Sequence, residues 1–260
     1  MDEPVAPKDA PTGIIDTRFE TDSYIVADAN VLAFGALGNG YTDDTTAFQA
    51  AIDYVSSLGG GTVYVPAGYY CLTKTLDLPI GVGLVGDLKK GTAHGTVLCI
   101  YGGKGVTDIG KAAVMMNHQS AVINVAFWYP EQTFVNGRPI PYPPTLVQNG
   151  SESVTIRNVT FVNSYFGIHF GKNGNNSLQY VRDVYGTCLS TGYYNDNSYD
   201  IGRVEGVTFT PDVWLASGLP GTPNAALLRT YMIRNSVGMQ HRKRHVRDAY
   251  MGVCRRAYAR

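Results

Sequence analysis

Three carboxylates lie close together in the segment GTCLSTGYYNDNSYDIGRVEG (186–206). They are Asp196, Asp200 and Glu205. One carboxyl group can donate a proton while a second accepts one, provided that the fold holds both on the same side. The alternative is a polar loop between strands, because the run Asn-Asp-Asn-Ser is typical of turns. We predict that these three residues do acid–base work, with the loop as the competing interpretation.

A second pair of carboxylates follows a glycine-rich turn in AFGALGNGYTDDTTAFQAAID (33–53). Glycines beside Asp43 and Asp44 could form a phosphate cradle, a metal site or an acid–base pair. However, the segment contains neither of the two glycine-rich patterns of phosphate-binding loops. Aspartate just before a helix accepts hydrogen bonds from free backbone N–H groups and stabilises the helix by about 1 kcal/mol. We therefore predict that Thr42, Asp43 and Asp44 cap the N-terminus of a helix.

Histidine and cysteine show no spacing typical of a metal site. In YFGIHFGKN (165–173), His169 alternates with Ile168 and Phe170, so it points outward if the two apolar side chains point inward. His241 and His245 are four residues apart but lack the glutamate of HExxH. The four cysteines are Cys71, Cys99, Cys188 and Cys254. Without a CxxC pair they are expected to be small buried hydrophobic residues, and we predict no metal site.

The elements that would position these residues begin with a helix at about 43–58. Its apolar residues recur with the spacing of one helix face at Ala47, Phe48, Ala51, Ile52 and Val55. Three glycines at 59–61 supply the left-handed residue that commonly follows a helix. Prolines and glycines then divide 62–87 into short alternating strands.

The rest of the chain repeats one β pattern. The segments AVINVAF (121–127), SVTIRNVTF (153–161), LQYVRDVYG (178–186) and GRVEGVTF (202–209) each place a turn-forming residue before a valine. Those residues are Asn124, Asn158, Asp183 and Gly206, at intervals of 34, 25 and 23 residues. A proline-rich insertion, 130–144, accounts for the longer first interval. A β repeat of this length predicts an all-β solenoid, a right-handed parallel β-helix, with stacked asparagines at the turns.

The composition agrees with a β protein and limits the kinds of partner that we expect. The chain has 260 residues, 44% of them hydrophobic and 16% charged, with 30 glycines and 18 tyrosines. No apolar run approaches the roughly 20 residues that span a bilayer, and the N-terminus lacks the charged and apolar regions of a signal peptide. We therefore expect neither a membrane partner nor a signal peptide in this chain.

Charge is unevenly distributed. Residues 241–260 hold seven of the 21 lysines and arginines and a single acid, which leaves 14 basic and 20 acidic residues in 1–240. An acidic body argues against a nucleic-acid partner. A basic tail could bind nucleic acid or a membrane surface, but a solvated or disordered end explains it better. A third interpretation is that the tail is not native coding sequence.

The segment VLAFGALGNGYTDDTTAFQAAIDYVSSLGGGTVYVPAGYY (31–70) resembles the N-terminal signature of the pectate-lyase superfamily of right-handed β-helix proteins. This form is shared by rhamnogalacturonase-like and epimerase-like proteins, glycoside hydrolases of families 28 and 55 and several phage tailspikes. The resemblance is dense over 31–87 and extends to about 218. It implies that the helix closes the N-terminal end of the β-helix. The domains expected are an extended lead-in (1–22), the β-helix (23–238) and a basic tail of doubtful native structure (239–260).

The resemblance implies a carbohydrate-active enzyme, a hydrolase or lyase that acts on a polysaccharide along the side of the helix, outside the cell or on a phage. Rings of Tyr193, Tyr194 and Trp214, together with His169, are the expected substrate contacts. No cofactor is expected, except Ca²⁺ if the enzyme is a lyase.

Two other functions remain open. The family-28 pattern of N-x-D, D-D and G-H-G is absent, and Asn195-Asp196-Asn197 does not match it. The chain could be a non-catalytic carbohydrate-binding or structural β-helix of phage-tail or adhesin type, or an inactive fragment without its catalytic coils. The sequence does not specify the polysaccharide or the oligomeric state.

Overall fold

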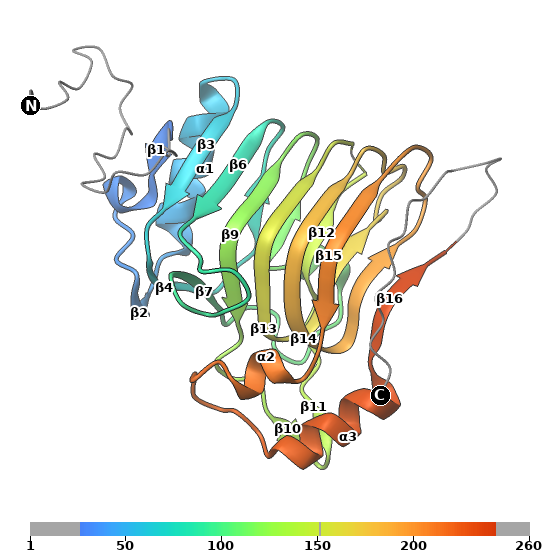
Figure 1. Cartoon of the computed structure of the whole chain (residues 1–260). Coiled ribbons are helices and arrows are strands. Elements are labelled where there is room, and N and C mark those ends of the chain that lie inside the picture. Colours follow the sequence, from blue (N-terminus) through green and yellow to red (C-terminus); the bar gives the residue numbers. More distant parts are fainter. Residues whose placement is uncertain (1–26, 151, 243–260) are drawn as a thin grey trace, which may run out of the picture.

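A computed structural model describes residues 27–150 and 152–242 as a mostly β structure with few helices (Figure 1). Fourteen of its strands form one curled sheet in which all named pairs are parallel. A small antiparallel pair, β10 (Phe134–Val135) and β11 (Arg138–Pro139), lies within the predicted proline-rich insertion. The predicted lead-in and the tail from residue 243 onward, with His245 and Cys254, lie outside the described residues.

The first stack of parallel strands contains β1 (Ala29–Asn30), β3 (Gly61–Val65), β6 (Val82–Gly86) and the first residues of β9 (Ala121–Trp128), β13 (Thr155–Phe170), β14 (Tyr180–Asn195) and β15 (Arg203–Phe209). One position is in register across all seven, namely Ala29, Val63, Leu84, Val122, Ile156, Val181 and Val204. All but the last are buried. Because strand side chains alternate, the residues on either side of this column point away from the core.

The second stack contains β2 (Asn39–Asp43), β4 (Gly68–Leu72), β7 (Thr96–Ile100) and later residues of β9, β13, β14 and β15. Its inward column continues the core with Tyr70, Leu98, Phe127, Phe161, Gly186 and Phe209. The rings of Phe127 and Phe161 stack with centroids 5.8 Å apart. Aromatic residues thus fill the interior at this stack.

The corner between the first and second stacks confirms the predicted turn residues. Asn124, Asn158, Asp183 and Gly206 have φ angles of 57°, 49°, 54° and 64°. The Asn158 side chain donates a 2.9 Å hydrogen bond to Asn124 Oδ1, as expected for stacked asparagines. Asn, Asp and Gly tolerate this left-handed conformation better than other residues, which is why the repeat places them there.

The third stack contains β5 (Leu76–Leu78), β8 (Val114–Met116), β12 (Pro144–Gln148), the ends of β13 and β14, and β16 (Val237–His241). Its inward column is Leu76, Val114, Leu146, Ile168, Tyr193 and Met239. The adjacent outward column is Asp77, Met115, Val147, His169, Tyr194 and Gln240. Since β16 pairs with β14 up to His241, the β structure runs three residues past the predicted boundary at 238.

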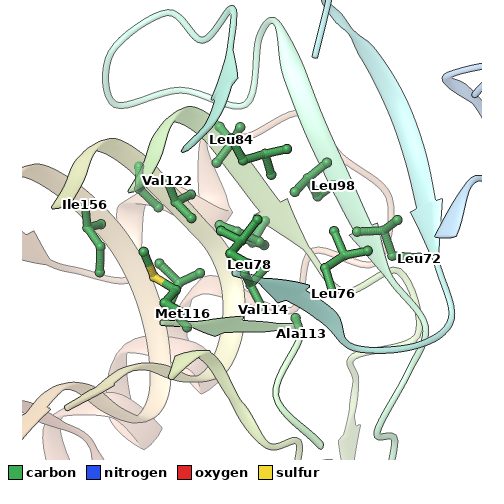
Figure 2. Packing of buried hydrophobic residues seen from close by; sticks show 14 of the residues in the cluster. Leu72, Leu76, Leu78, Leu84, Leu98, Ala113, Val114, Met116, Val122 and Ile156 are labelled. Atoms are coloured by element: carbon green, nitrogen blue, oxygen red, sulfur yellow. The ribbon is translucent and has the colours of Figure 1, made fainter. Parts of the chain in front are cut away.

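The core lies between the three stacks, whose apolar side chains point toward one another (Figure 2). The first stack contributes Leu84, Val122 and Ile156, and the second contributes Leu72 and Leu98. The third contributes Leu76, Leu78, Val114 and Met116. Full burial of each such side chain stabilises the fold by about 1.5–3 kcal/mol.

Helix α1 (Thr45–Ser57) contacts β1, β3, β5 and β6 at the N-terminal end of the stacks (Figure 1). It buries Phe48, Ala51, Ile52 and Val55 and ends before Gly59, whose φ is 96°. The helix, its apolar face and its glycine stop therefore agree with the prediction. A short 3₁₀ helix, η1 (Val31–Phe34), precedes it, and a second, η2 (Ile109–Lys111), lies between β7 and β8.

The predicted helix cap is only partly correct. Asp44 is the residue before α1, but its carboxylate makes no capping hydrogen bond. It instead accepts N–H bonds from Leu37 at 2.7 Å and Gly38 at 3.3 Å, in the glycine-rich turn. Asp43 accepts the N–H of Thr45 at 3.0 Å. The glycine-rich turn folds back over the start of the helix. Its backbone N–H groups therefore bind the Asp44 carboxylate in place of the free N–H groups of the helix.

Two helices near the C-terminus depart from the all-β expectation. They are α2 (Asp212–Leu215) and α3 (Ala225–Asn235). Asn224 accepts the N–H groups of Ala226 and Leu227 at the start of α3, and Leu228 and Met232, four residues apart, are its buried residues. Two apolar contacts are too few to produce a clear helical period in the sequence.

Cys71, Cys99 and Cys188 are buried and free, as predicted. Within the described ranges, no helix is both long and apolar enough to cross a membrane.

Candidate active site on the third stack

The end of β13 places His169 on the outer side of the third stack. Its neighbours Ile168 and Phe170 are fully buried in the core cluster, so the predicted outward direction of His169 is confirmed. The imidazole is nevertheless only 8% exposed. Its Nδ1 is buried and has no hydrogen-bond partner within the described residues.

Tyr194 lies beside His169 because β13 and β14 pair in register at these two residues. Their rings stack with centroids 4.7 Å apart and planes inclined by 25°. Phe166 contacts both rings, with centroids 5.8 Å from His169 and 6.5 Å from Tyr194. The histidine is thus held between aromatic rings.

Asp196 follows β14 and completes the cluster. The Tyr194 hydroxyl donates to Asp196 Oδ2 at 3.2 Å, and the N–H of Asn197 donates to Oδ1 at 2.9 Å. Asp196 is 9% exposed. Three of the seven predicted site residues, His169, Tyr194 and Asp196, are therefore brought together, and we call them the His–Tyr–Asp cluster.

Burial lowers the pKa of His169 below its usual value of 6.5, and the positive charge of Lys172 acts in the same direction. The negative charge of Asp196 acts in the opposite direction but does not reverse the shift. The imidazole is therefore neutral at pH 7, the state in which a ring nitrogen can accept a proton.

Two of the predicted aromatic contacts are wrong as surface platforms for sugars. Tyr193 is 0% exposed because it occupies the inward column beside Ile168, with its ring against Phe170. Trp214, on α2, is also 0% exposed and packs with a cluster that includes Val162 and Leu189. Neither ring can stack on a sugar in this arrangement.

The other two carboxylates lie apart from the cluster. Asp200 is exposed in the loop after β14 and accepts the N–H of Ile201 at 2.7 Å. Glu205 is on β15 in the first stack, in register with Arg182. Asp196 and Glu205 therefore belong to different stacks, with the loop that carries Asp200 between them. Acid–base roles for Asp200 and Glu205 stay predictions.

Two residues of the site were not identified from the sequence. Phe166 and Lys172 flank His169 in the chain, but nothing in their types or spacing distinguishes them before the pairing of β13 with β14 is known.

A hollow of about 270 Å³ lies elsewhere, between the 91–94 loop and α2, and includes His94 and Asp212 in its lining. None of the seven predicted residues lines it.

A sequence model of the family described as "Rhamnogalacturonase A/epimerase, pectate lyase-like" matches residues 29–108. Mannuronan C5-epimerase AlgE1 of Azotobacter vinelandii is 65% identical over 43 residues, which are 16% of this chain and 3% of that protein. Alginate lyase 7 of the same organism is 63% identical over 41 residues, 16% of this chain and 5% of that protein.

Among solved structures, the A-module of the A. vinelandii mannuronan C-5 epimerase AlgE6 is similar, with a TM-score of 0.50 and 22% identity. The alignment covers 66% of this chain and 49% of that module. The chain thus spans about half of the solved module and a small part of the curated relatives. At this identity the likeness concerns the fold alone. The match to the family model over residues 29–108 includes residues 31–70, on which the resemblance to the pectate-lyase superfamily rests.

Proposed function

We propose that this protein is a carbohydrate-active enzyme that removes the C5 proton of a uronate in an acidic polysaccharide, as a lyase or an epimerase. The observation that carries the proposal is the His–Tyr–Asp cluster on the outer side of the third stack. The sequence relatives support the substrate class, since AlgE1 is named a mannuronan C5-epimerase and another relative an alginate lyase. From the resemblance to the pectate-lyase superfamily, we propose that the protein acts outside the cell or on a phage particle.

We propose further that the three stacks are the sides of a right-handed parallel β-helix and that α1 closes its N-terminal end. Seven strands in register in the first stack and six in the third support this arrangement. A rigid stack of this kind would hold His169 and Tyr194 on adjacent strands at a fixed separation of about 4.8 Å between backbones.

In this proposal His169 is the base. A neutral imidazole accepts the C5 proton, and the electron pair of the broken C–H bond passes to the uronate carboxyl group. Lys172, which is close enough to affect the imidazole electrostatically, would stabilise that negative charge. General base catalysis of this kind typically contributes a factor of about 10²–10⁴ in rate.

Tyr194 is the proposed acid. Its hydroxyl would give a proton to the glycosidic oxygen as the C4–O bond breaks in elimination. In epimerisation, C5 would instead take a proton from water on the face opposite His169. Asp196, which accepts the hydroxyl proton at 3.2 Å, orients this group. The stacking of Tyr194 on His169 brings the acid and the base into one site.

Hydrolysis is less well supported. It requires two carboxyl groups on either side of the scissile bond, about 5–10 Å apart. Asp196 is in the cluster, whereas Glu205 is in the first stack and Asp200 is in the loop between them.

The residues of the cluster do not fit the Ca²⁺ ion that the family uses in some lyases. Calcium takes about 6–8 oxygen ligands. Asp196 is the carboxylate of the cluster, and both its oxygens already accept hydrogen bonds. Within the described part of the chain no three His, Cys, Asp or Glu residues gather as a metal site would require. We therefore assign no step to a cation.

The test is a set of reactions with alginate and polygalacturonate in deuterated water. A lyase creates a double bond that absorbs near 235 nm, while an epimerase incorporates deuterium at C5 without that absorbance. We expect one of these signals from the intact protein and a loss of about 100-fold or more in His169→Gln and Tyr194→Phe. His94→Gln and Tyr41→Phe, which change exposed residues outside the cluster, are the matched controls and should keep full activity.

Folded protein that gives neither signal with any uronate polymer would overturn the proposal. Binding without turnover would identify a carbohydrate-binding protein or a fragment without activity. Full activity in His169→Gln would refute the assignment of the base.

A further inference from the structure

The outer side of the first stack carries arginines on three consecutive strands. Arg157 on β13 and Arg182 on β14 occupy the same register position, next to Glu205 on β15. In the neighbouring outward column, Tyr180 on β14 is in register with Arg203 on β15. All five alternate with the inward column of Ile156, Val181 and Val204, so their side chains point away from the core.

In two of these arginines the guanidinium group has no partner among the residues that the structure describes. Arg157 and Arg203 are exposed, and their guanidinium groups make no hydrogen bond or ion pair within the described residues. Arg182 donates to the Tyr180 hydroxyl at 3.3 Å and lies 3.4 Å from Asp183. Its side chain is still 52% exposed. The face therefore offers free N–H donors to solvent.

Arg157 occupies the same register position as Arg182, whose positive charge is partly balanced by Asp183 at 3.4 Å. Adjacent parallel strands are about 4.8 Å apart, so two like charges at one register position repel each other. An anion bound between the two guanidinium groups would remove this repulsion. Arginine binds carboxylate through two parallel hydrogen bonds, which makes it well suited to such a ligand.

A loop adds a fourth positive charge beside this face. Lys90, between β6 and β7, is 2.8 Å from Asp183 and 5.9 Å from the centre of the Tyr185 ring. The loop is tied down where Asn158 donates to the carbonyl of Leu88 at 2.9 Å. Lys90 thus offsets the negative charge of Asp183.

We propose that this surface, the arginine face formed by Arg157, Arg182, Arg203, Tyr180 and Lys90, binds a linear acidic polysaccharide that lies across the strands. Its carboxylates would bridge arginines of successive strands, and Tyr180 would contact a sugar ring. The arginine face lies on a different stack from the His–Tyr–Asp cluster, so it would hold the polymer away from the site of reaction. It shares the polymer class with the proposed function but does not depend on turnover.

The test measures binding of the intact protein to polygalacturonate, alginate and neutral dextran by isothermal titration calorimetry. We expect binding to the two acidic polymers, weaker as salt is raised, and none to dextran. The triple variant Arg157→Gln, Arg182→Gln, Arg203→Gln should bind at least tenfold more weakly. Lys74→Gln, Arg138→Gln, Arg234→Gln removes the same charge from exposed residues elsewhere and should bind as the wild type. Equal melting temperatures would show that both variants are folded.

The double variant His169→Gln, Tyr194→Phe separates this surface from the reaction site. It should keep the binding constant of the wild type within about twofold, even where it abolishes turnover. The proposal is overturned if the arginine triple variant binds as tightly as the wild type, if dextran binds equally well, or if duplex DNA binds more tightly than either acidic polysaccharide. Turnover without any binding that depends on the arginines would overturn this proposal alone and leave the proposed function standing.

Discussion

The imidazole of His169 stacks on the ring of Tyr194, with centroids 4.7 Å apart and planes inclined by 25°. The contact arises because β13 and β14 pair in register at these residues, with both side chains on the outer side of the third stack. It keeps a neutral imidazole beside a hydroxyl that is already hydrogen-bonded to Asp196. The proposed base and acid are thereby positioned by strand pairing before any substrate binds.

The buried imidazole makes stability depend on pH. Burial lowers the pKa of His169 in the folded state, while the unfolded chain titrates near 6.5. Between these two values the unfolded state binds more protons, so the free energy of unfolding rises with pH in that interval. We expect the protein to lose stability as pH falls through about 6.5, with no further loss from this residue below the folded pKa.

Urea unfolding of the wild type and His169→Gln at several pH values between about 5 and 8 measures this effect. The variant should lack the part of the pH dependence that belongs to His169, and His94→Gln should retain it. Activity should fall on the acid side as well, because a protonated imidazole cannot take the C5 proton. Identical pH profiles for the wild type and His169→Gln would contradict the assignment.

Gly171 controls how closely β13 and β14 approach next to the site. A Cβ atom there would lie 2.1 Å from the carbonyl oxygen of Asp196, and the φ of Gly171 is 89°. Gly171→Ala should therefore push the backbone of Asp196 away and disturb its bond to Tyr194. Gly174 also has a positive φ, of 133°, but a Cβ there meets no atom within 4 Å.

The two alanine variants separate the collision from the backbone strain. We expect the free energy of unfolding of Gly171→Ala to be about 1–3 kcal/mol lower than that of Gly174→Ala, as measured in urea. Gly171→Ala should also lose activity against polyuronates. Equal stability of the two would show that the strands can separate at Gly171 without cost.

The repeat could be predicted because each turn imposes the same backbone requirement. Asn124, Asn158, Asp183 and Gly206 all adopt positive φ, which few residue types tolerate, so the constraint is visible in residue identity. The outward direction of His169 was predictable for a similar reason, since Ile168 and Phe170 flank it. Local sequence patterns were thus enough to predict the length of the repeat and the outward direction of His169.

The rest of the site depended on pairing between distant segments. Tyr193 and Tyr194 are identical in type, and only the register of β14 with β13 decides that the first is buried and the second faces outward. Trp214 is buried by contacts of α2 with distant strands, which the sequence around it does not reveal. Residue type alone therefore assigned two buried rings to a binding surface.

The asparagine pair at the corner can be tested by mutation. Asn158 has a φ of 49°, and its amide donates to Asn124 Oδ1 and to the Leu88 carbonyl, both at 2.9 Å. Asn158→Ala loses both bonds and strains the backbone, which should cost about 2 kcal/mol or more in unfolding free energy. Asn158→Gly loses the bonds but not the favourable conformation, so it should cost less than Asn158→Ala. An alanine variant as stable as the glycine variant would show that the conformation contributes nothing.

Asp44 should stabilise the fold through the glycine-rich turn. It is 1% exposed, and its carboxylate accepts the N–H groups of Leu37 and Gly38 at 2.7 and 3.3 Å. Asp44→Ala leaves two N–H groups without their charged acceptor, and hydrogen bonds to charged groups are worth about 1.5–3 kcal/mol. We expect a loss of about 2 kcal/mol or more in urea unfolding. Asp53→Ala removes an exposed acceptor of a Gln49 hydrogen bond and should cost about 0.5 kcal/mol. Asp44 holds the turn against the start of α1. If Asp44→Ala lost no more stability than Asp53→Ala, the turn would keep its shape without the Asp44 carboxylate.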